Sequence, residues 1–459
     1  MDENTDVPHE GSRADRGRRA VSRKQALKAG AAAIAGMSAL PVLDAAGTAF
    51  ASSPGRAAHA TNVTISMWTH DILYVKFFTR RAKEWEKKYP QYHFTYNFVQ
   101  IPYNDLFTKV LANLSAGTGA PDLVGIEISA FSRFMKGEIA SKGLVDLSPL
   151  IGSQRSHFLR WEPYTYKGRI YGVESALCPV GLYYREDIFK DAGIKAPLDS
   201  YNDLLAAGRI LAKKGKYIMI VGSQDTGVWL EMFQQAGGHI FDASGKLTLD
   251  DPRAVQILEF LVKGTKDKLF WAPPDLTTAP AIAALKLNKV ATVLMPDWYA
   301  GYFLKPQVAE QKGKWRLQTM PVWSKGGRRV STLGGTGFAI TRQSKHQQLV
   351  WSLLHYTYMT ERNQVKRFQE INYFPTMKEA LHDPGVTNVP DPYFGGAKIG
   401  GVFASVAADI PQQYQSPYWN EALTQLTNEY TNAMARRKTP ARAIKDATTA
   451  IQKIMARGS

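Results

Sequence analysis

The stretch that decides the fold is Tyr171–Phe189, with the sequence YGVESALCPVGLYYREDIF. It follows a Lys-Gly-Arg turn at Lys167–Arg169, and its apolar run predicts one buried strand over Ala176–Tyr184 that leads into a helix at Glu186. Continuous apolar strands of this kind lie in sheets that are covered on both faces. Strand–helix alternation precedes this stretch and resumes after it. We therefore interpret it as a crossing between two α/β lobes, with the functional site in the gap between them.

The length and composition of the chain suit two packed lobes. The chain has 459 residues, and 44% of them are hydrophobic. A single core rarely grows past about 250–300 residues. The lone cysteine, Cys178, excludes an intramolecular disulfide and a multi-cysteine metal site, and its apolar surroundings predict a buried core residue. The formal charge is +17, but the Lys and Arg residues are scattered, which predicts a solvated basic surface and no nucleic-acid partner.

Residues 1–60 are expected to be a targeting segment that is disordered or cleaved. Arg18-Arg19 and the following Ser22–Lys28 resemble a twin-arginine signal, with Lys24 where the second arginine usually stands. The alanine-rich run that follows, Ala29–Leu43, is too short to span a bilayer permanently. Small-residue cleavage candidates come next, with no cysteine near them for a lipoprotein anchor. We expect a soluble exported protein, periplasmic or extracytoplasmic, and leave the Tat and Sec routes open.

The first part of the remaining chain alternates strands with helices. Predicted strands lie at Asn62–Trp68, Tyr92–Gln100 and Asp122–Ile128, with helices over residues 72–89 and Asn104–Ala116. This order implies a mostly parallel sheet with right-handed crossovers. In open sheets of this kind, ligands bind beyond the carboxyl ends of the strands.

Polar and aromatic side chains stand at those strand ends. Trp68 and His70 follow the first strand, and Glu127 follows the third. A carboxylate in that position either faces the crevice or caps the next helix, and we place Glu127 in the ligand site. Later strands end in the same way, since Val290–Leu294 runs directly into Asp297 and Trp298.

The loop after the strand Tyr217–Val221 carries Gln224 and is followed by Trp229. Trp315–Pro321 is interpreted as a second crossing and residues 372–376 as a third. The return strand, Thr332–Ile340, contains Gly-Gly-Thr-Gly, but no Gly-Lys-Ser/Thr follows it, which argues against a nucleotide-binding loop. Helices are expected towards the C-terminus.

Several stretches, taken in order, resemble the extracellular solute-binding proteins of family 1. These are the carbohydrate receptors of ABC importers and include the maltodextrin-binding proteins. Each stretch is weak alone, but together they cover the chain from about Thr64 to its end. The stretches are Ala120–Val124, Tyr171–Glu174, Leu182–Asp187, Gly237-Gly238, Met295–Trp298, Gly334–Ile340 and Lys438–Ala443.

The resemblance implies a two-lobed α/β fold of the periplasmic-binding-protein type, joined by about three hinge crossings and closing on a sugar. It implies a first lobe of residues 61–175 with about 330–375, and a second of 176–329 with about 376–459, whose C-terminal helices pack near the hinge. It implies no catalysis, no cofactor and no metal, a carbohydrate ligand, ABC permease subunits as partners and a monomeric protein. The positions it assigns to the ligand are Trp68, His70, Glu127, Gln224, Trp229, Asp297, Trp298, Asn372 and Trp419.

A tryptophan beside a carboxylate suits a sugar, because pyranose C–H faces stack on indole while hydroxyl groups donate to carboxylates. Such charge-assisted hydrogen bonds are about twice as strong as neutral ones. Three other hypotheses stay open. Glu127 and Asp297 could serve as the two carboxyl groups of a glycoside hydrolase, which lie about 5–10 Å apart. Tyr183-Tyr184 could bind ferric ion. The basic chain could instead take an anionic sugar, a polyol phosphate or a peptide.

Overall fold

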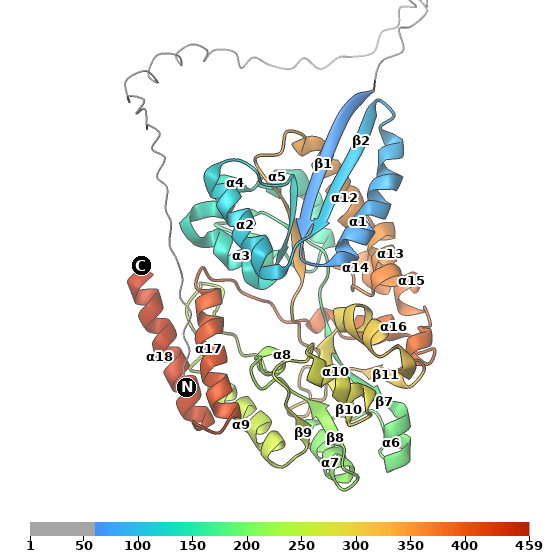
Figure 1. Ribbon diagram of the computed structural model, residues 1–459, viewed down its shortest axis with the longest axis vertical. Helices are drawn as coiled ribbons and strands as arrows, with labels where there is room; N and C mark the ends of the chain where they lie inside the picture. The colour runs from blue at the N-terminus through green and yellow to red at the C-terminus, as the bar shows by residue number, and fades with distance from the viewer. Residues whose placement is uncertain (1–59, 459) are drawn as a thin grey trace, which may run out of the picture. The chain divides into compact units, whose positions relative to one another are not determined.

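The computed structural model of the chain describes residues 60–458 (Figure 1). All of the predicted targeting segment except Ala60 therefore lies outside the described residues. Over residues 60–458, no helix has both the length and the apolar character needed to cross a membrane.

The first of two five-stranded sheets has the spatial order β2-β1-β3-β12-β6. The strand β1 runs parallel to β2 and to β3, whereas β12 is antiparallel to β3 and to β6. The predicted parallel arrangement of the first three strands is thereby confirmed. The strands are β1 (Thr61–Thr69), β2 (Tyr92–Gln100), β3 (Leu123–Glu127), β6 (Val173–Glu174) and β12 (Thr336–Ile340).

Helices cover both faces of this sheet because side chains along each strand alternate between the faces. On β3, Leu123 packs with the helices on one side, while Val124 and Ile126 pack with those on the other. The first side holds α1 (Ile72–Trp85) and α12 (Gln347–Tyr358), with α13 (Glu361–Ile371) against α1. The second side holds α2 (Tyr103–Ala116), α3 (Ile128–Met135) and α4 (Ile139–Gly143).

The second sheet has the order β11-β7-β10-β8-β9. Its central strand β10 is antiparallel to β7 and parallel to β8. All seven residues of β10 are buried, as expected for a strand covered on both faces. The strands are β7 (Val180–Arg185), β8 (Tyr217–Ile220), β9 (Phe270–Trp271), β10 (Val290–Pro296) and β11 (Trp315–Gln318), and a separate two-stranded sheet pairs β4 (Thr165–Tyr166) with β5 (Arg169–Ile170).

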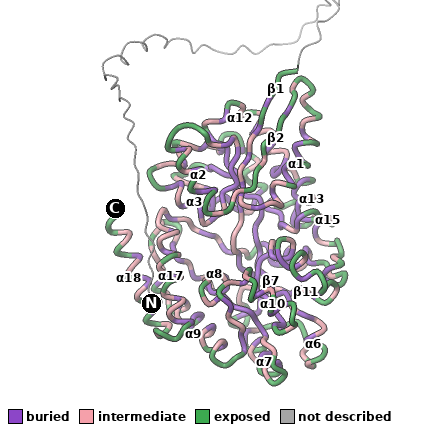
Figure 2. The backbone as a smooth tube through the Cα atoms, viewed as in Figure 1, coloured by how far each residue is buried: buried purple, intermediate pink, exposed green. Residues whose placement is uncertain are grey.

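The helices of the second half pack around this second sheet, and the C-terminal pair α17 and α18 packs together and against α9. In Figure 2 the central strands lie in the buried interior, whereas the outer helix faces and the projecting ends of β1 and β2 are exposed. The helices are α6 (Glu186–Ala192), α7 (Tyr201–Ala212), α8 (Gly227–Gln235), α9 (Pro252–Lys266), α10 (Ala279–Lys286), α11 (Lys305–Gln307), α16 (Ile399–Ala404), α17 (Trp419–Met434) and α18 (Pro440–Gly458), with short helices α5 (Ser148–Ile151), α14 (Lys378–His382) and α15 (Pro384–Thr387).

Two strands begin later in the structure than the sequence predicts. The strand expected over Ala176–Tyr184 begins only at Val180, because Cys178 has φ 51° and cannot continue a pleated strand. The return strand expected from Thr332 begins at Thr336, because Gly334 and Gly335 have φ of 79° and 123°. In both places the irregular backbone lies at the edge of the cavity described below.

The chain passes from the first sheet to the second between Glu174 and Val180, and it returns between Gln318 and Thr336. This supports a two-lobed α/β architecture. The lobe boundaries named above, the number of hinge crossings and the place of the C-terminal helices near the hinge stay predictions.

Candidate functional site

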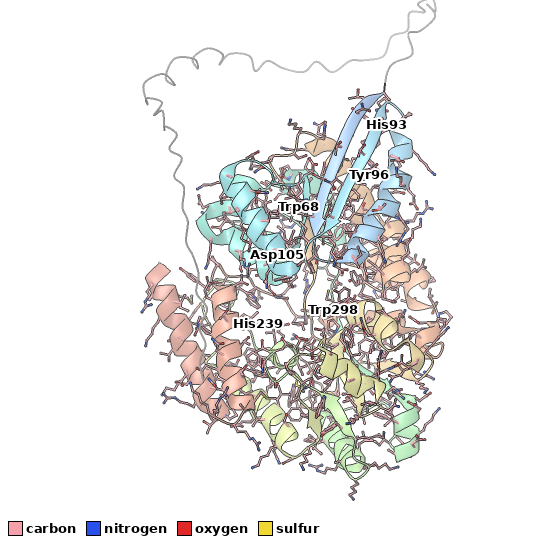
Figure 3. The ribbon with its side chains drawn as sticks, in the orientation of Figure 1. Trp68, His93, Tyr96, Asp105, His239 and Trp298 are labelled. Atoms are coloured by element: carbon pink, nitrogen blue, oxygen red, sulfur yellow. The ribbon has the colours of Figure 1, made fainter. Side chains whose placement is uncertain are left out.

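A cavity of about 200 Å³ lies between the carboxyl end of the first sheet and the segment that follows β10. Figure 3 shows Trp298 near the middle of the molecule, between the two sheets. Most of the lining is apolar or aromatic, with a few polar groups placed among the rings, which is the usual character of a small-molecule site. The lining residues are His70, Asp71, Tyr74, Glu127, Cys178, Trp298, Tyr302, Gly334, Gly335, Thr336 and Tyr373.

Trp298 supplies a flat apolar surface in this cavity. Its indole Nε1 donates a hydrogen bond to the carbonyl of Leu333 at 3.0 Å, which fixes the ring while leaving it half-buried. The backbone of Gly334 lies so close that an added Cβ would stand 3.3 Å from Nε1. Together with its positive φ, this contact explains why a glycine occupies position 334. The indole is therefore held ready to stack on a ligand.

Glu127 lies at the end of β3 and caps helix α3. Its carboxylate accepts hydrogen bonds from the amide of Ser129 at 2.8 Å and from the hydroxyl of Tyr103 at 3.0 Å. Burial raises the pKa of Glu127 to about 6, although both of these hydrogen bonds favour the ionised form. At neutral pH the group is ionised and offers acceptor positions to the cavity.

His70 stands beside Glu127 at the cavity wall. Its ring meets the ring of Tyr103 edge-on, with centroids 5.7 Å apart. Burial lowers the pKa of His70 to about 4, so the imidazole is neutral at physiological pH. Its buried Nδ1 has no hydrogen-bond partner among the described residues and remains available to a ligand hydroxyl.

Three further side chains with polar groups line the cavity, and the sequence analysis did not assign them to the site: Asp71, Tyr74 and Tyr373. The hydroxyl of Tyr373 donates a short hydrogen bond to the carboxylate of Asp71, which also caps α1 by accepting from Leu73 at 2.8 Å. Ser175 donates to the hydroxyl of Tyr74 at 2.7 Å. Burial raises the pKa of Asp71. In the sequence, Asp71 could have been recognised as a site residue because it directly follows His70 and precedes an apolar helix.

Tyr302 is the third aromatic lining residue, after Tyr74 and Tyr373, that the sequence analysis missed. It lies four residues after Trp298 in a π-helical turn, Ala300–Leu304, and 43% of its surface is exposed. Turns of this type occur frequently at functional sites. Tyr302 and Trp298 give the cavity two rings from one segment.

Asp297, one of the predicted ligand contacts, does not line the cavity. Only 1% of it is exposed, and its two carboxylate oxygens accept from the amides of Trp298, at 2.8 Å, and Phe374. Burial raises the pKa of Asp297 to about 7. Through these bonds Asp297 holds Trp298 and the 372–376 segment in place, and its role as a ligand contact stays a prediction.

Trp229 and Trp419 are also absent from the cavity lining, so their roles as ligand contacts stay predictions. The indole of Trp229 is fully buried, stacks on Phe233 with centroids 4.8 Å apart, and donates to the carbonyl of Ala254 at 3.1 Å. Trp419 is 3% exposed and packs near Phe241 in the core that surrounds the second sheet. Both lie in helices whose apolar sides face that core.

Trp68, Gln224 and Asn372 complete the predicted set, and the structure keeps them apart from the cavity lining. Trp68 lies under the Lys109 ammonium, which is 4.5 Å from the ring centroid. Gln224 is exposed on the loop after β8. Asn372 ends α13 with φ 60° and accepts from the ammonium of Lys305 at 2.6 Å.

The structure also bears on two alternative chemistries. Within residues 60–458 no group of three or more His, Cys, Asp or Glu side chains is placed to hold a metal ion. The hydroxyl of Tyr183 donates to the carbonyl of Pro296 at 3.1 Å, and Tyr184 stacks on Phe189, so the two tyrosines do not share a ferric site. For a glycoside hydrolase, Asp297 is committed to backbone amides and is not a second carboxyl group facing Glu127.

Three comparisons with known proteins agree on the kind of protein. Residues 80–392 match the model of the family described as bacterial extracellular solute-binding protein. The chain is 29% identical, over 394 residues, to an arabinooligosaccharide-binding protein of Bacillus subtilis (strain 168), covering 83% of this chain and 90% of the relative. It is 26% identical, over 398 residues, to a lactose-binding protein of Rhizobium radiobacter, covering 84% of this chain and 92% of the relative.

The fold matches solved structures of solute receptors. The GacH receptor of Streptomyces glaucescens GLA.O, described both unliganded and with acarbose, aligns with a TM-score of 0.72 at 18% identity, covering 86% of this chain and 98% of that one. A binding protein associated with an ABC transporter from B. animalis subsp. lactis Bl-04, in complex with beta-1,6-galactobiose, aligns with a TM-score of 0.70 at 23% identity, covering 86% and 97%. These alignments confirm the predicted two-lobed α/β fold.

Proposed function

The chain belongs to the family of bacterial extracellular solute-binding proteins, and we propose that its solute is a mono- or oligosaccharide, bound without chemistry in the cavity beside Trp298. One ring of the sugar stacks on the Trp298 indole. Its hydroxyl groups donate to Glu127 and pair with the neutral imidazole of His70. Closing of the two lobes around the ligand then removes these polar groups from water, where an unpaired one costs about 1–3 kcal/mol.

The observation that carries this proposal is the pairing of a fixed, half-buried indole with acceptor side chains from the other sheet in a single cavity. An indole face suits the C–H face of a pyranose or furanose, and an ionised carboxylate suits its hydroxyl rim. A metal ion would not use the indole face. The sugar names carried by the relatives in B. subtilis and R. radiobacter support the same proposal.

We further propose that the protein delivers its ligand to the permease subunits of an ABC importer and acts as a monomer outside the cytoplasm. The family is one of extracellular proteins, which supports this location. Export would use the predicted signal within residues 1–60, by the Tat or the Sec route and without a lipid anchor.

Isothermal titration calorimetry against a panel of neutral mono- and oligosaccharides tests the proposal. We expect at least one saccharide to bind, and Trp298→Ala to weaken its binding by about tenfold to a hundredfold. Trp323→Ala is the matched control, because Trp323 is 36% exposed but lies outside the cavity lining, and its variant should bind as the wild type does. A panel with no saccharide response, together with a response to amino acids or metal ions, would contradict the proposal.

A further inference from the structure

The turns that lead into the strands of the second sheet are rich in lysine. Four of its five strands, β8, β9, β10 and β11, each follow a short stretch with at least two lysines. These stretches are residues 213–216, 266–269, 286–289 and 312–314, and their one acidic residue, Asp267, pairs with Lys263. We call their lysines the lysine face: Lys213, Lys214, Lys216, Lys266, Lys268, Lys286, Lys289, Lys312 and Lys314.

The topology of the second sheet brings the four turns to one edge. The strand β8 is parallel to β9 and to β10, whereas β7 is antiparallel to β10 and to β11. The starts of β8, β9, β10 and β11 therefore lie side by side, next to the end of β7. Because neighbouring strands are about 4.8 Å apart, the turns extend over about 20 Å. In Figure 1 this edge, with α6 and α7, is the end of the described chain farthest from β1 and β2.

Contacts between the turns show that lysines far apart in sequence are neighbours in space. The ammonium of Lys216 donates to the carbonyl of Asn288 at 2.9 Å, which joins the turn before β8 to the turn before β10. A hollow of about 190 Å³ lies where these two turns meet the turn before β11, and its lining includes Lys214, Lys216 and Lys314. Lysines that are scattered along the sequence are thus gathered by the fold.

The charge of the lysine face is not neutralised by ion pairs. Eight of its nine lysines are exposed, and Lys216 is partly buried. Among the described residues, none of the nine forms an ion pair with an acidic side chain. The acidic groups beside them are paired with other basic residues instead: Arg185, Lys190, Lys263 and Arg316. Two exposed acidic residues, Asp191 and Glu310, lie close to these turns. The edge therefore keeps a strong positive charge.

Helix ends explain only part of this lysine content. The helices α7, α9 and α10 end at this edge, and a lysine in the last turn of a helix is stabilised by the helix dipole. This accounts for Lys266 and Lys286, the last residues of α9 and α10. The turn before β11 follows only a 3₁₀ turn, Ala309–Gln311, and still carries two lysines. The corresponding turn of the first sheet, residues 117–122 between α2 and β3, has no lysine.

Exposed apolar side chains stand among the lysines. Leu287 lies between Lys286 and Lys289 and is 63% exposed, the highest value for a large apolar residue in the described chain. Ile210, in the last turn of α7 before Lys213, is 41% exposed. Nucleic acid and other soluble polyanions are bound largely through charge. A lipid bilayer takes up apolar side chains beside basic ones. The combination therefore favours an anionic membrane surface.

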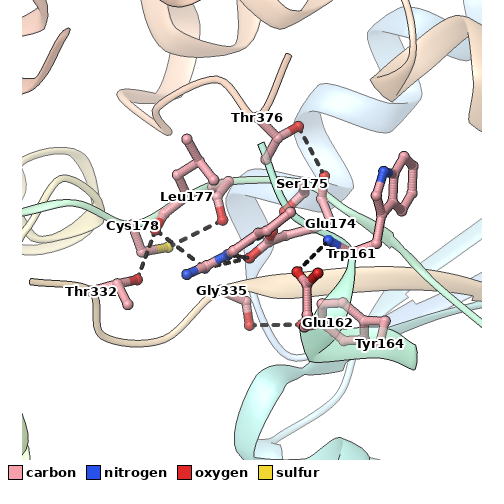
Figure 4. Close-up of polar contacts among 12 residues, drawn as sticks. Trp161, Glu162, Tyr164, Glu174, Ser175, Leu177, Cys178, Thr332, Gly335 and Thr376 are labelled. Atoms are coloured by element: carbon pink, nitrogen blue, oxygen red, sulfur yellow. Dashed lines mark hydrogen bonds and ion pairs between the residues drawn. The ribbon is translucent and has the colours of Figure 1, made fainter. Parts of the chain in front are cut away.

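The lysine face and the cavity lie at opposite edges of the second sheet. The strand β10 runs from Val290, next to Lys289, to Pro296, a distance of about 20 Å, and Trp298 follows at the cavity. At the cavity edge β7 begins just after Cys178, which Figure 4 shows together with residues of the return crossing. A protein resting on a surface through the lysine face would keep its cavity open to solution.

We propose that the lysine face docks the protein reversibly on an anionic lipid bilayer, with the lysines at the headgroup phosphates and Leu287 in the interfacial layer. Clusters of about four to eight basic residues bind anionic bilayers in this way. The attraction fades within a Debye length, about 10 Å at 0.1 M salt, so lysines gathered on one face contribute more than lysines spread over the molecule.

The bilayer that we assign is the outer surface of the cytoplasmic membrane, where the permease proposed above would lie. Only this placement rests on the proposed function, because binding to vesicles does not depend on the solute. Docking would keep a receptor without a lipid anchor close to its permease while its cavity collects solute.

Sedimentation with vesicles tests the docking, using phosphatidylcholine with about one-third phosphatidylglycerol and, for comparison, phosphatidylcholine alone. At about 50 mM NaCl we expect the full chain to bind the anionic vesicles about tenfold or more tightly than the neutral ones, and about 500 mM NaCl should release it. The variant Lys213→Gln/Lys266→Gln/Lys286→Gln/Lys312→Gln, with one lysine changed in each turn, should bind the anionic vesicles about tenfold or more weakly than the wild type. Unchanged binding in this variant would overturn the proposal.

A matched control removes the same charge from another part of the surface. The variant Lys87→Gln/Lys345→Gln/Lys445→Gln/Lys453→Gln changes exposed lysines that form no ion pair among the described residues, and it should bind within about threefold of the wild type. Equal weakening in both variants would show that net charge alone matters and would overturn the lysine face. Binding of duplex DNA by a wild type that does not bind vesicles would overturn the choice of partner.

A fluorescent reporter tests which surface meets the bilayer. Leu287→Cys and Leu150→Cys each place a thiol at an exposed position, whereas the native Cys178 is buried and does not react with a dye. An environment-sensitive dye at position 287 should shift to the blue when anionic vesicles are added, and the same dye at position 150, in α5, should not. Both variants share residues 1–59, so the comparison isolates the lysine face from that segment. Equal shifts at the two positions would overturn the proposal.

Saccharide titration separates this proposal from the proposed function. The four-lysine variant of the lysine face should bind a saccharide within about twofold of the wild type, because its changes lie about 20 Å from the cavity. A protein that binds saccharide but no vesicle refutes the docking and leaves the proposed function standing. A protein that docks on vesicles but binds no saccharide supports the lysine face and refutes the proposed function.

Discussion

Trp298 and Trp229 stand in similar sequence settings, yet only one of them lines the cavity. Each follows a buried strand of the second sheet and an acidic residue, Asp297 or Asp225. Trp298 comes two residues after β10, is half-buried and lines the cavity. Trp229 comes nine residues after β8, inside helix α8, and is fully buried. Trp298 lies close enough to the end of β10 to reach the cavity. A helix that begins in between turns its apolar residues to the core.

Exchanging the two tryptophans for alanine should separate stability from binding most strongly. Trp229→Ala removes a fully buried indole that stacks on Phe233, and should lower the free energy of unfolding by about 3–5 kcal/mol. Trp298→Ala removes a half-buried ring and should lower the free energy of unfolding much less. Chemical denaturation measures both values. If Trp298→Ala destabilises the free protein as much as Trp229→Ala does, Trp298 is a core residue and the comparison fails.

Asp297, which holds Trp298 in place, should make the free energy of unfolding depend on pH. Its pKa is about 7 in the folded protein and about 4 when unfolded, because burial disfavours the carboxylate. Between pH 4 and 7 the folded state therefore holds a proton that the unfolded state releases, and the free energy of unfolding falls as the pH rises through this window. The contribution of this group amounts to up to about 4 kcal/mol.

Denaturation of the wild type and of Asp297→Asn at pH 5 and pH 8 checks this expectation. The variant cannot titrate at position 297, so its loss of stability between the two pH values should be smaller than that of the wild type. Glu127 and Asp225, whose pKa values burial raises to about 6, titrate in both proteins and cancel in the difference. An identical pH dependence in the two proteins would show that Asp297 stays ionised.

Glu127 should give the smallest effect, a change in how binding depends on pH. Its pKa is about 6 in the free protein, so its carboxylate is mostly protonated at pH 5 and ionised at pH 7. Because the charged form accepts the stronger hydrogen bonds, we expect the affinity for the sugar to fall about threefold to tenfold from pH 7 to pH 5. Glu127→Gln should bind more weakly at pH 7 and show a flatter profile. His70 titrates near pH 4, below this window. A wild-type affinity that is constant from pH 7 to pH 5 would contradict a role for the Glu127 carboxylate.

The sequence was sufficient to predict β1, β2 and β3 because these strands are separated by helices with apolar residues at helical spacing. It predicted β2 over Tyr92–Gln100 with both ends correct. It did not predict the interruption at Cys178, because a positive φ at a non-glycine residue is imposed by the tertiary structure and leaves no local pattern. The glycines at 334 and 335 were a sequence signal for irregular backbone before β12, but the predicted strand included them.

For the site, strand ends located Trp298, Glu127 and His70, all of which line the cavity. The pattern could not show that Asp297 binds two backbone amides, since one of them belongs to Phe374, far along the chain. The contact between Tyr373 and Asp71 is equally remote in sequence. Which of several polar side chains faces a ligand is decided by such long-range contacts, and these exist only once the lobes have packed.

Tryptophan fluorescence during titration with the saccharide that binds tests the central claim most directly. The account predicts that a sugar stacking on Trp298 changes the emission of the wild type, that Trp229→Phe keeps this change, and that Trp298→Phe loses most of it and binds more weakly. A full emission change with wild-type affinity in Trp298→Phe would show that the sugar binds away from this ring and would contradict the account.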